Sequence, residues 1–278
     1  MAEIRKIAIA TGTRADWGLL SGIARALAAR ADCEVTILAT NMHLSPRYGN
    51  TISEIVADGF ADPVRVEMPL SADTDCSTVE AMAVCMSGMA RELSRLRPDL
   101  IVILGDRFEM LATATAALML RVPIVHIAGG EISEGAIDDS IRHSITKMAS
   151  LHLTATEPYR RRVIAMGEAP DRVINTGAIG VYNILHEPLM TRRELEESID
   201  FDLTDKSILV TYHPATLDDE EPAVRCKALL DALDRFEDHK VLITYPNNDP
   251  RGRIIIDLIE AYAAARPGRV RVVPSLGK

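Results

Sequence analysis

A loop and a helix start near the middle of the chain hold the densest group of side chains that could perform acid–base chemistry. The carboxylates Glu131, Glu134, Asp138 and Asp139 follow a pair of glycines. Like charges held close together raise the pKa of at least one member, which is what a general acid or base needs at neutral pH. We therefore expect a proton-transferring site here, the alternative being a solvated acidic loop with a helix cap.

Two cationic residues follow these carboxylates on the same predicted helix. Arg142 and His143 come one helical turn after Asp138 and Asp139, so Arg142 can share a helix face with one of them. The apolar run 122–127 predicts a buried strand just before the loop. The group is therefore delivered beyond the carboxyl end of a strand, where open α/β sheets bind ligands.

Two other predicted strands also end in charged residues. The first strand runs into TGTRADWG, where helix-start amides and Arg14 favour an anion, the alternative being a plain loop with Asp16 as the helix N-cap. Another strand ends in LGDRFE, where Asp106 and Arg107 can face a ligand together. The alternative for this pair is a helix-capping aspartate beside an exposed arginine.

Histidines follow two more strands. His43 ends the motif Asn-Met-His, and His213 precedes a proline after an apolar run. A single histidine is more often structural than catalytic. An imidazole at the ligand edge of a second sheet could still bind phosphate or transfer protons near neutral pH, and we keep this hypothesis for His213.

The elements that must position these residues alternate between two patterns. Segments of helical period separate apolar runs rich in Val, Ile and Leu. Nearly continuous apolar strands are typical of parallel sheets covered by helices on both faces, so the alternation predicts a doubly wound α/β fold. The predicted strands are 4–10, 34–40, 64–68, 100–104, 122–127, 151–155, 172–176, 208–212, 241–245 and 270–273.

The pattern of apolar and polar residues changes after Gly177, and this change divides the chain into two parts. Residues 182–203 are polar without a strand pattern, and the alternation then restarts. We predict a Rossmann-like N-terminal domain over residues 1–179 and a partial Rossmann-like C-terminal domain over residues 180–278. The second part shows about three strands with no helix after the last, so we expect it to be truncated.

Composition narrows the functional classes. The 278 residues are 47% hydrophobic, and 31 basic against 40 acidic residues give a net charge of −9. Without a basic stripe and interleaved aromatics, nucleic acid is a poor partner. No run approaches the roughly 18 apolar residues of a membrane span, and no secretory leader is visible, so we expect a cytoplasmic protein away from membranes. The four cysteines lack metal-site spacing and are expected to be buried thiols.

Taken together, these segments closely resemble the hydrolysing UDP-N-acetylglucosamine 2-epimerases of the sialic-acid type. The similarity runs through essentially the whole chain, and GDRFE with DDSIRHSITKM is its most specific part. The resemblance implies two Rossmann-like domains facing a cleft, the GT-B arrangement, with a UDP-sugar between them. It also implies no cofactor or metal, and a homodimer or homotetramer. The segments are TGTRAD, NMH, LGDRFE, HIAGGE, IDDSIRHSITKM, NTGAIG, TYHP and PNNDPRG.

The resemblance further implies a reaction and its residues. UDP-N-acetylglucosamine and water give UDP and N-acetylmannosamine by anti elimination through 2-acetamidoglucal, followed by hydration. Arg14 and Arg142 become diphosphate contacts. By matching position, the implied catalytic residues are Asp106, Glu131, Asp138 and His213. The implied substrate-binding residues are Arg14, Asp16, His43, Arg107, Arg142, His143 and Asn247.

Some alternatives stay open. Many relatives carry Glu at the position of Ala128, so the division of base and acid among the carboxylates is undecided. Relatives also continue into a serine-rich UDP-binding loop, expected here after Lys278. The substrate could instead be a UDP-linked 2,4-diacetamido-trideoxyhexose of the legionaminic-acid route. A GT-B glycosyltransferase and a non-catalytic binding or regulatory module are the other classes.

Overall fold

The chain forms two compact units. The computed structural model describes residues 4–69, 72, 74–186, 189–217, 220–247, 252–274 and 276. One unit consists of Met1–Ser71 and Val79–Glu187, and the other of Ala72–Thr78 and Pro188–Lys278. The division near residue 187 lies just after α7 (Ile179–His186), a helix that begins where we placed the domain boundary.

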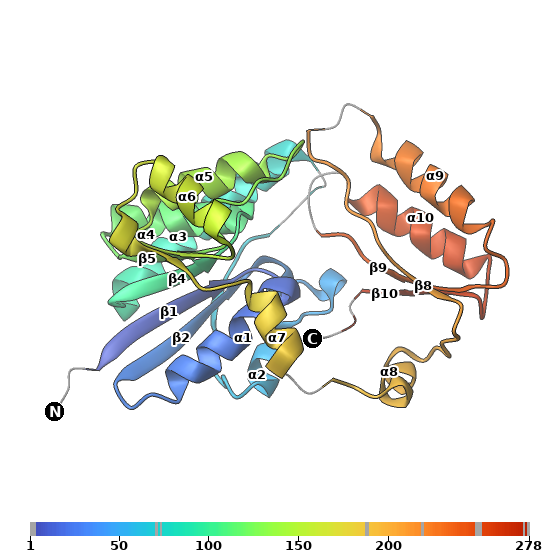
Figure 1. Ribbon diagram of the computed structural model, residues 1–278, viewed down its shortest axis with the longest axis horizontal. Helices are drawn as coiled ribbons and strands as arrows, with labels where there is room; N and C mark the ends of the chain where they lie inside the picture. Colours follow the sequence, from blue (N-terminus) through green and yellow to red (C-terminus); the bar gives the residue numbers. More distant parts are fainter. Residues whose placement is uncertain are drawn as a thin grey trace. The chain divides into compact units, whose positions relative to one another are not determined.

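The first unit is built on a seven-stranded parallel sheet in the order β3-β2-β1-β4-β5-β6-β7 (Figure 1). The chain starts in the middle of this sheet and winds outward in both directions, which confirms the predicted doubly wound topology. The direction reverses between β1 and β4, and such a switch point is where these sheets bind ligands. The strands are β1 (Arg5–Thr11), β2 (Cys33–Thr40), β3 (Val64–Val66), β4 (Leu100–Leu104), β5 (Ile124–Ile127), β6 (Leu151–Thr154) and β7 (Val173–Asn175).

Helices cover both faces of this sheet (Figure 1). Ala8 and Ala10 of β1 pack in the core beneath α3, α4 and α5, whereas Ile7 and Ile9 pack in the core beneath α1 and α2. Adjacent residues of one strand thus serve opposite faces, as the period of two requires. The helices are α1 (Arg14–Ala28), α2 (Ile52–Ala57), α3 (Asp75–Leu96), α4 (Phe108–Met119), α5 (Asp138–Met148) and α6 (Glu157–Ala165), with short 3-10 turns at Asn41–Leu44, Pro46–Tyr48 and Pro170–Arg172.

The second unit contains a parallel sheet of three strands in the order β10-β9-β8. Its core lies between the sheet and helices α9 and α10, while α8 and Phe201 cover part of the other face. Leu209 on β8 is 62% exposed, so that face is incompletely covered. The elements are α8 (Arg192–Ile199), β8 (Ser207–Thr211), α9 (Pro222–Leu233), β9 (Lys240–Thr244), α10 (Arg253–Ala264) and β10 (Val270–Val273).

Two smaller expectations can be compared with the structure. Cys85 and Cys226 are buried and Cys33 is half-buried, but Cys76 is exposed, so the prediction of buried thiols is wrong for Cys76. Its position at the start of α3 lies outside the apolar stripe of that helix. Among the described residues, no helix combines the length and apolar character needed to cross a membrane.

A steric constraint fixes the turn that follows β5. Gly130 has φ +81°, and a Cβ there would lie 2.6 Å from the Tyr159 carbonyl oxygen and 2.8 Å from Val163 Cγ2. Arg162 of α6 donates a hydrogen bond to the Gly130 carbonyl. Ala128 also has a positive φ, of +64°, which is uncommon for a residue with a side chain. The backbone that leads into the acidic loop is therefore held by close packing against α6.

We predict that Gly130→Ala destabilises the protein more than Gly135→Ala. Both glycines have positive φ, but no atom of the described residues lies within 4 Å of a Cβ built on Gly135. The backbone penalty of about 1 kcal/mol is shared by both variants, whereas overpacking adds about 1–3 kcal/mol at residue 130. Urea unfolding of the two variants measures the difference, and equal losses would contradict the packing argument.

Candidate active site at the carboxyl edge of the first sheet

The predicted site residues of the first unit gather on three neighbouring strands. Arg14 and Asp16 follow β1, Asp106 and Arg107 follow β4, and the acidic loop that begins with Glu131 follows β5. These strands are adjacent in the sheet, and all of them are parallel. Parallel strands deliver their carboxyl ends to one edge, so the residues share the edge beside the switch point.

Arg142 is the hub of this edge. Its Nη2 forms an ion pair with Asp106 and donates to Ser133 Oγ at 3.0 Å, and its Nη1 lies 3.6 Å from Asp139 Oδ1. Only 5% of the side chain is exposed, and this burial lowers the pKa of the guanidinium. Arg142 thus joins the end of β4 to the acidic loop. Its contact with a diphosphate stays a prediction, because the guanidinium here binds Asp106.

The carboxylates of the acidic loop and of the start of α5 have different surroundings. Asp139 Oδ1 accepts a hydrogen bond from the Ser133 backbone N–H at 3.2 Å, and its Oδ2 lies 3.7 Å from His143 Nε2. Asp139 therefore organises the loop, a role that we did not predict. Glu131 is half-buried, and this burial raises its pKa. A raised pKa suits a carboxylate that exchanges protons near neutral pH.

The loop after β1 is closed by a reciprocal capping box. Thr13 Oγ1 accepts from the Asp16 backbone N–H at 3.2 Å, while Asp16 Oδ2 accepts from the Thr13 N–H at 3.0 Å and the Gly12 N–H at 3.2 Å. The N-cap is therefore Thr13, so the alternative that named Asp16 as the cap is wrong by three residues. Asp16 instead reaches back from the first turn. Burial and the nearby Glu109 raise the pKa of Asp16 to about 6.

Arg14 is the first residue of α1 and carries positive charge to the same edge. Its Nη1 is buried and has no hydrogen-bond partner among the described residues, and burial lowers the pKa of the guanidinium. A buried polar atom of this kind is usually paired in a native structure. An anionic ligand at the helix start would supply the partner, which agrees with the predicted role of Arg14.

Arg107 and Asp106 do not form the cap considered above. The N-cap residue of α4 is Arg107, which has no side-chain cap hydrogen bond, and Asp106 pairs with Arg142 instead. Arg107 is 11% exposed, and its Nε donates to Glu109 Oε1 at 2.8 Å. Glu109 belongs to the same GDRFE motif, yet sequence reasoning gave it no role. The available signal was a carboxylate two residues after an arginine, directly beyond a buried strand.

His43 and His126 of the first unit are both fully buried. His43 is 0% exposed, with Nε2 3.0 Å from Thr11 Oγ1 and Nδ1 2.9 Å from Thr51 Oγ1. Burial lowers its pKa to about 4, so the ring is neutral at pH 7. We predicted a substrate contact for His43, and this structure instead places it beneath the edge. His126 of β5 is equally buried, with Nε2 2.8 Å from the Gly105 carbonyl oxygen.

The two predicted site residues of the second unit, His213 and Asn247, are in contact. His213 follows β8 and is exposed, and its Nδ1 accepts a hydrogen bond from the Asn247 backbone N–H at 3.3 Å. Asn247 follows the neighbouring strand β9. The adjacent carboxyl ends of two parallel strands thus bring the pair together. Residues 248–251 of the PNNDPRG segment lie outside the described part of the chain.

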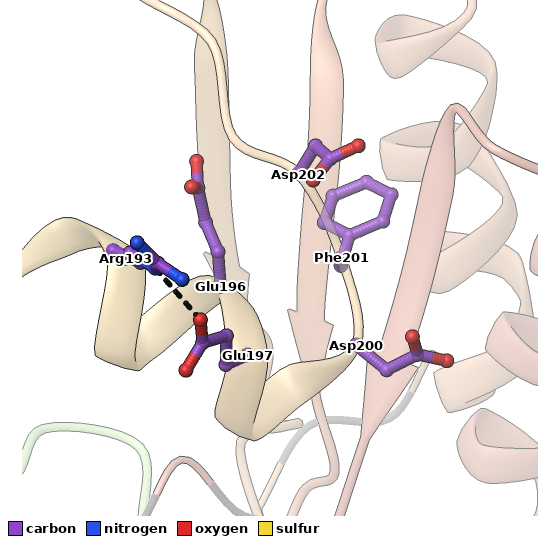
Figure 2. Close-up of a pocket in the computed structure, with 6 residues that line it drawn as sticks. All are labelled: Arg193, Glu196, Glu197, Asp200, Phe201 and Asp202. Carbon is purple, nitrogen blue, oxygen red and sulfur yellow. Dashed lines mark hydrogen bonds and ion pairs between the residues drawn. The ribbon is translucent and has the colours of Figure 1, made fainter.

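A surface pocket beside α8 is lined by residues other than the predicted site residues (Figure 2). Arg193 points toward Glu197 one turn along the helix, with 2.8 Å between Nε and Oε1. The lining is mostly acidic. The lining residues are Arg193, Glu196, Glu197, Asp200, Phe201 and Asp202. Across the described ranges, no group of three or more His, Cys, Asp or Glu side chains is placed to hold a metal ion.

The fold and the sequence identify the class of protein. A solved UDP-GlcNAc 2-epimerase from Methanocaldococcus jannaschii, in complex with UDP-GlcNAc and UDP, matches 96% of this chain and 73% of its own length, with a TM-score of 0.75 and 18% identity. A likeness at this identity shows the GT-B-like fold alone. Residues 25–278 match the family described as UDP-N-acetylglucosamine 2-epimerase, and the chain belongs to that family.

Two curated relatives are more similar in sequence. The GDP/UDP-N,N'-diacetylbacillosamine 2-epimerase (hydrolyzing) of Campylobacter jejuni is 35% identical over 98% of this chain and 71% of its own length. The UDP-N,N'-diacetylbacillosamine 2-epimerase (hydrolyzing) of Legionella pneumophila is 34% identical over 93% of this chain and 68% of its own length. Their similarity covers both units.

We predict that Arg142→Met destabilises the protein by about 3 kcal/mol, because Asp106 loses its buried counter-charge. Arg95→Met is the matched control, since Arg95 pairs with Glu92 at 2.7 Å but is 61% exposed. An exposed pair of this kind contributes about 0–1 kcal/mol. Urea unfolding measures both changes. If the two variants lose the same stability, Arg142 does not hold the edge together.

Proposed function

We propose that the protein is a hydrolysing 2-epimerase of a UDP-linked 2-acetamido sugar. The observation that carries the proposal is the group of Asp106, Glu131 and Asp138 with Arg14 at one edge of the first sheet, in a chain of this family. A carboxylate base and charge stabilisation of a departing diphosphate are what such a reaction requires.

The chemistry explains why both kinds of group are needed. The hydrogen on C2 of the sugar is not next to a carbonyl, so its removal must be coupled to departure of UDP from C1. A carboxylate takes the C2 proton, the C1–C2 double bond forms, and the C1–O bond breaks with its electrons leaving on UDP. Water then adds across the double bond, placing hydroxyl on C1 and a proton on the opposite face of C2.

We assign roles within this scheme from the geometry of the described residues. Glu131 is half-buried with a raised pKa, which supports a proton-transferring role. Asp106 and Asp138 are further acid–base candidates, with Asp106 held by Arg142. The Nη1 of Arg14 is buried and has no hydrogen-bond partner among the described residues, which supports a contact with the diphosphate. His213 and Asn247, which contact each other in the second unit, are assigned to the nucleotide or the leaving group.

The substrate has two candidates. The family description and the sequence resemblance favour UDP-N-acetylglucosamine, whose product N-acetylmannosamine is a precursor of sialic acids. The two relatives at 35% and 34% identity are named as 2-epimerases of nucleotide-linked N,N'-diacetylbacillosamine, and they favour UDP-N,N'-diacetylbacillosamine, a 2,4-diacetamido sugar. The reaction at C1 and C2 is the same for both, so the choice depends on contacts with C4 and C6.

Incubation of the purified full-length protein with each sugar nucleotide tests the proposal. We expect release of UDP and the free 2-epimerised sugar from at least one of them without any acceptor, as measured by NMR of the product. Turnover of only the diacetamido sugar would exclude the first candidate. A strict requirement for an acceptor would instead indicate a glycosyltransferase, and absence of turnover with both sugars would refute the proposal.

Substitution of single carboxylates tests the site. We expect Glu131→Gln and Asp106→Asn to fold and to lower kcat by about 100-fold or more, the usual loss when an acid–base group is removed. Glu134→Gln, an exposed residue of the same loop, should leave kcat near the wild-type value. Steady-state kinetics with far-UV circular dichroism as the folding check measures this, and unchanged activity of both site variants would refute the assignment.

A further inference from the structure

A buried carboxylate lies at the topological switch point of the first sheet. Glu109 is in the first turn of α4, after β4, and the neighbouring strand β1 leads into the loop of Gly12 and Asp16. Its side chain is 0% exposed. A carboxylate almost never reaches this degree of burial unless it is paired, so its partners indicate what it does.

One partner is an arginine at the same edge. Arg107 Nε donates to Glu109 Oε1 at 2.8 Å, and the Arg107 side chain is 11% exposed. A charge-assisted hydrogen bond through Nε fixes the plane of the guanidinium, because the group is rigid. Glu109 therefore determines where the positive charge of Arg107 lies.

The other partner is the backbone of the loop after β1. A Cβ built on Gly12 would lie 2.2 Å from Glu109 Oε1, 2.7 Å from Cγ and 2.8 Å from Cδ. The Glu109 side chain thus rests directly on this glycine, which precedes Arg14 by two residues. Glu109 is also close enough to Asp16 that its charge contributes to the raised pKa of that carboxyl.

We propose that Glu109 is a positioning residue that fixes Arg107 and the Gly12–Asp16 loop against each other across the switch point. It sets the spacing between the two arginine-bearing loops, and so the placement of Arg14 and Arg107 against an anionic group. Glu109 itself is fully buried, so it acts through Arg107 and the loop. The inference rests on the proposed function, because the anionic group in question is the diphosphate of the substrate.

A double-mutant cycle on UDP binding tests this role. We expect Glu109→Ala to weaken UDP binding about tenfold, the loss of one charge-assisted hydrogen bond that orients a cation. In an Arg107→Ala background, Glu109→Ala should cost much less, since the residue that it positions is gone. Glu109→Gln should restore most of the affinity, because an amide oxygen still accepts from Arg107 Nε. Isothermal titration calorimetry with UDP and with inorganic pyrophosphate measures these affinities.

A second pair of variants tests the contact with the loop. Gly12→Ala should displace Glu109 and weaken UDP binding as Glu109→Ala does, and it should cost little when combined with Glu109→Ala. Gly18→Ala is its matched control, because a Cβ built there has no atom within 4 Å in the part of the chain that the structure describes. Glu157→Ala is the control for Glu109→Ala, since Glu157 is also in a first helical turn but forms its ion pair with Arg160 at the surface.

The outcomes separate this inference from the proposed function. Additive losses in the cycle, or loss of stability with unchanged UDP affinity in Glu109→Ala, would overturn the positioning role and leave the function standing. Binding of UDP or pyrophosphate without sugar turnover would refute the function while the cycle still decides the role of Glu109. If the wild-type protein binds neither UDP nor pyrophosphate, both are refuted.

Discussion

The site depends on the ion pair and the hydrogen bond that the buried guanidinium of Arg142 forms. Removing a charge from water is costly, and the cost is offset only if the charge is paired and hydrogen-bonded. Asp106 and Ser133 supply those partners, and they come from different strand ends. One cation therefore fixes the turn after β4 and the loop after β5 in a single arrangement. The loop is held in place by that requirement, because moving it away would cost the buried guanidinium its hydrogen bond to Ser133.

A second constraint is steric and acts on the same loop from the other side. Gly130 packs against the α6 backbone, and Gly129 lies so near His126 and Thr146 that a Cβ would be 3.1 Å from each of their side chains. The buried histidine in turn bonds the Gly105 carbonyl after β4. Electrostatic and packing constraints thus converge on two strand ends. Catalytic groups need this kind of support, since small displacements of reacting groups cost large factors in rate.

Much of the fold could be predicted because its signals are local. Continuous apolar strands separated by helical periods gave ten strands whose observed bounds differ by at most two residues at either end, and chain alternation implied the parallel order. Motifs after strands located Arg14, Asp106 and Glu131 at one edge, because parallel strands end together. The partners of individual side chains could not be predicted in the same way. Whether Arg142 meets Asp106 or a ligand, and whether His43 faces solvent or core, depends on side-chain packing that sequence spacing does not encode. Glu109 escaped notice for the same reason, since its burial is a tertiary property.

The contact between His213 and Asn247 determines which hydrogen the imidazole carries. A ring nitrogen that accepts an N–H hydrogen bond has no hydrogen of its own, so in the neutral ring Nδ1 is bare and Nε2 holds the hydrogen. His213 is thereby preset as a donor from Nε2, without taking up a proton from solvent. To act as a base through Nε2, the ring would first have to change tautomer and give up the Asn247 bond, so the backbone after β9 restricts which ring nitrogen can take up a proton.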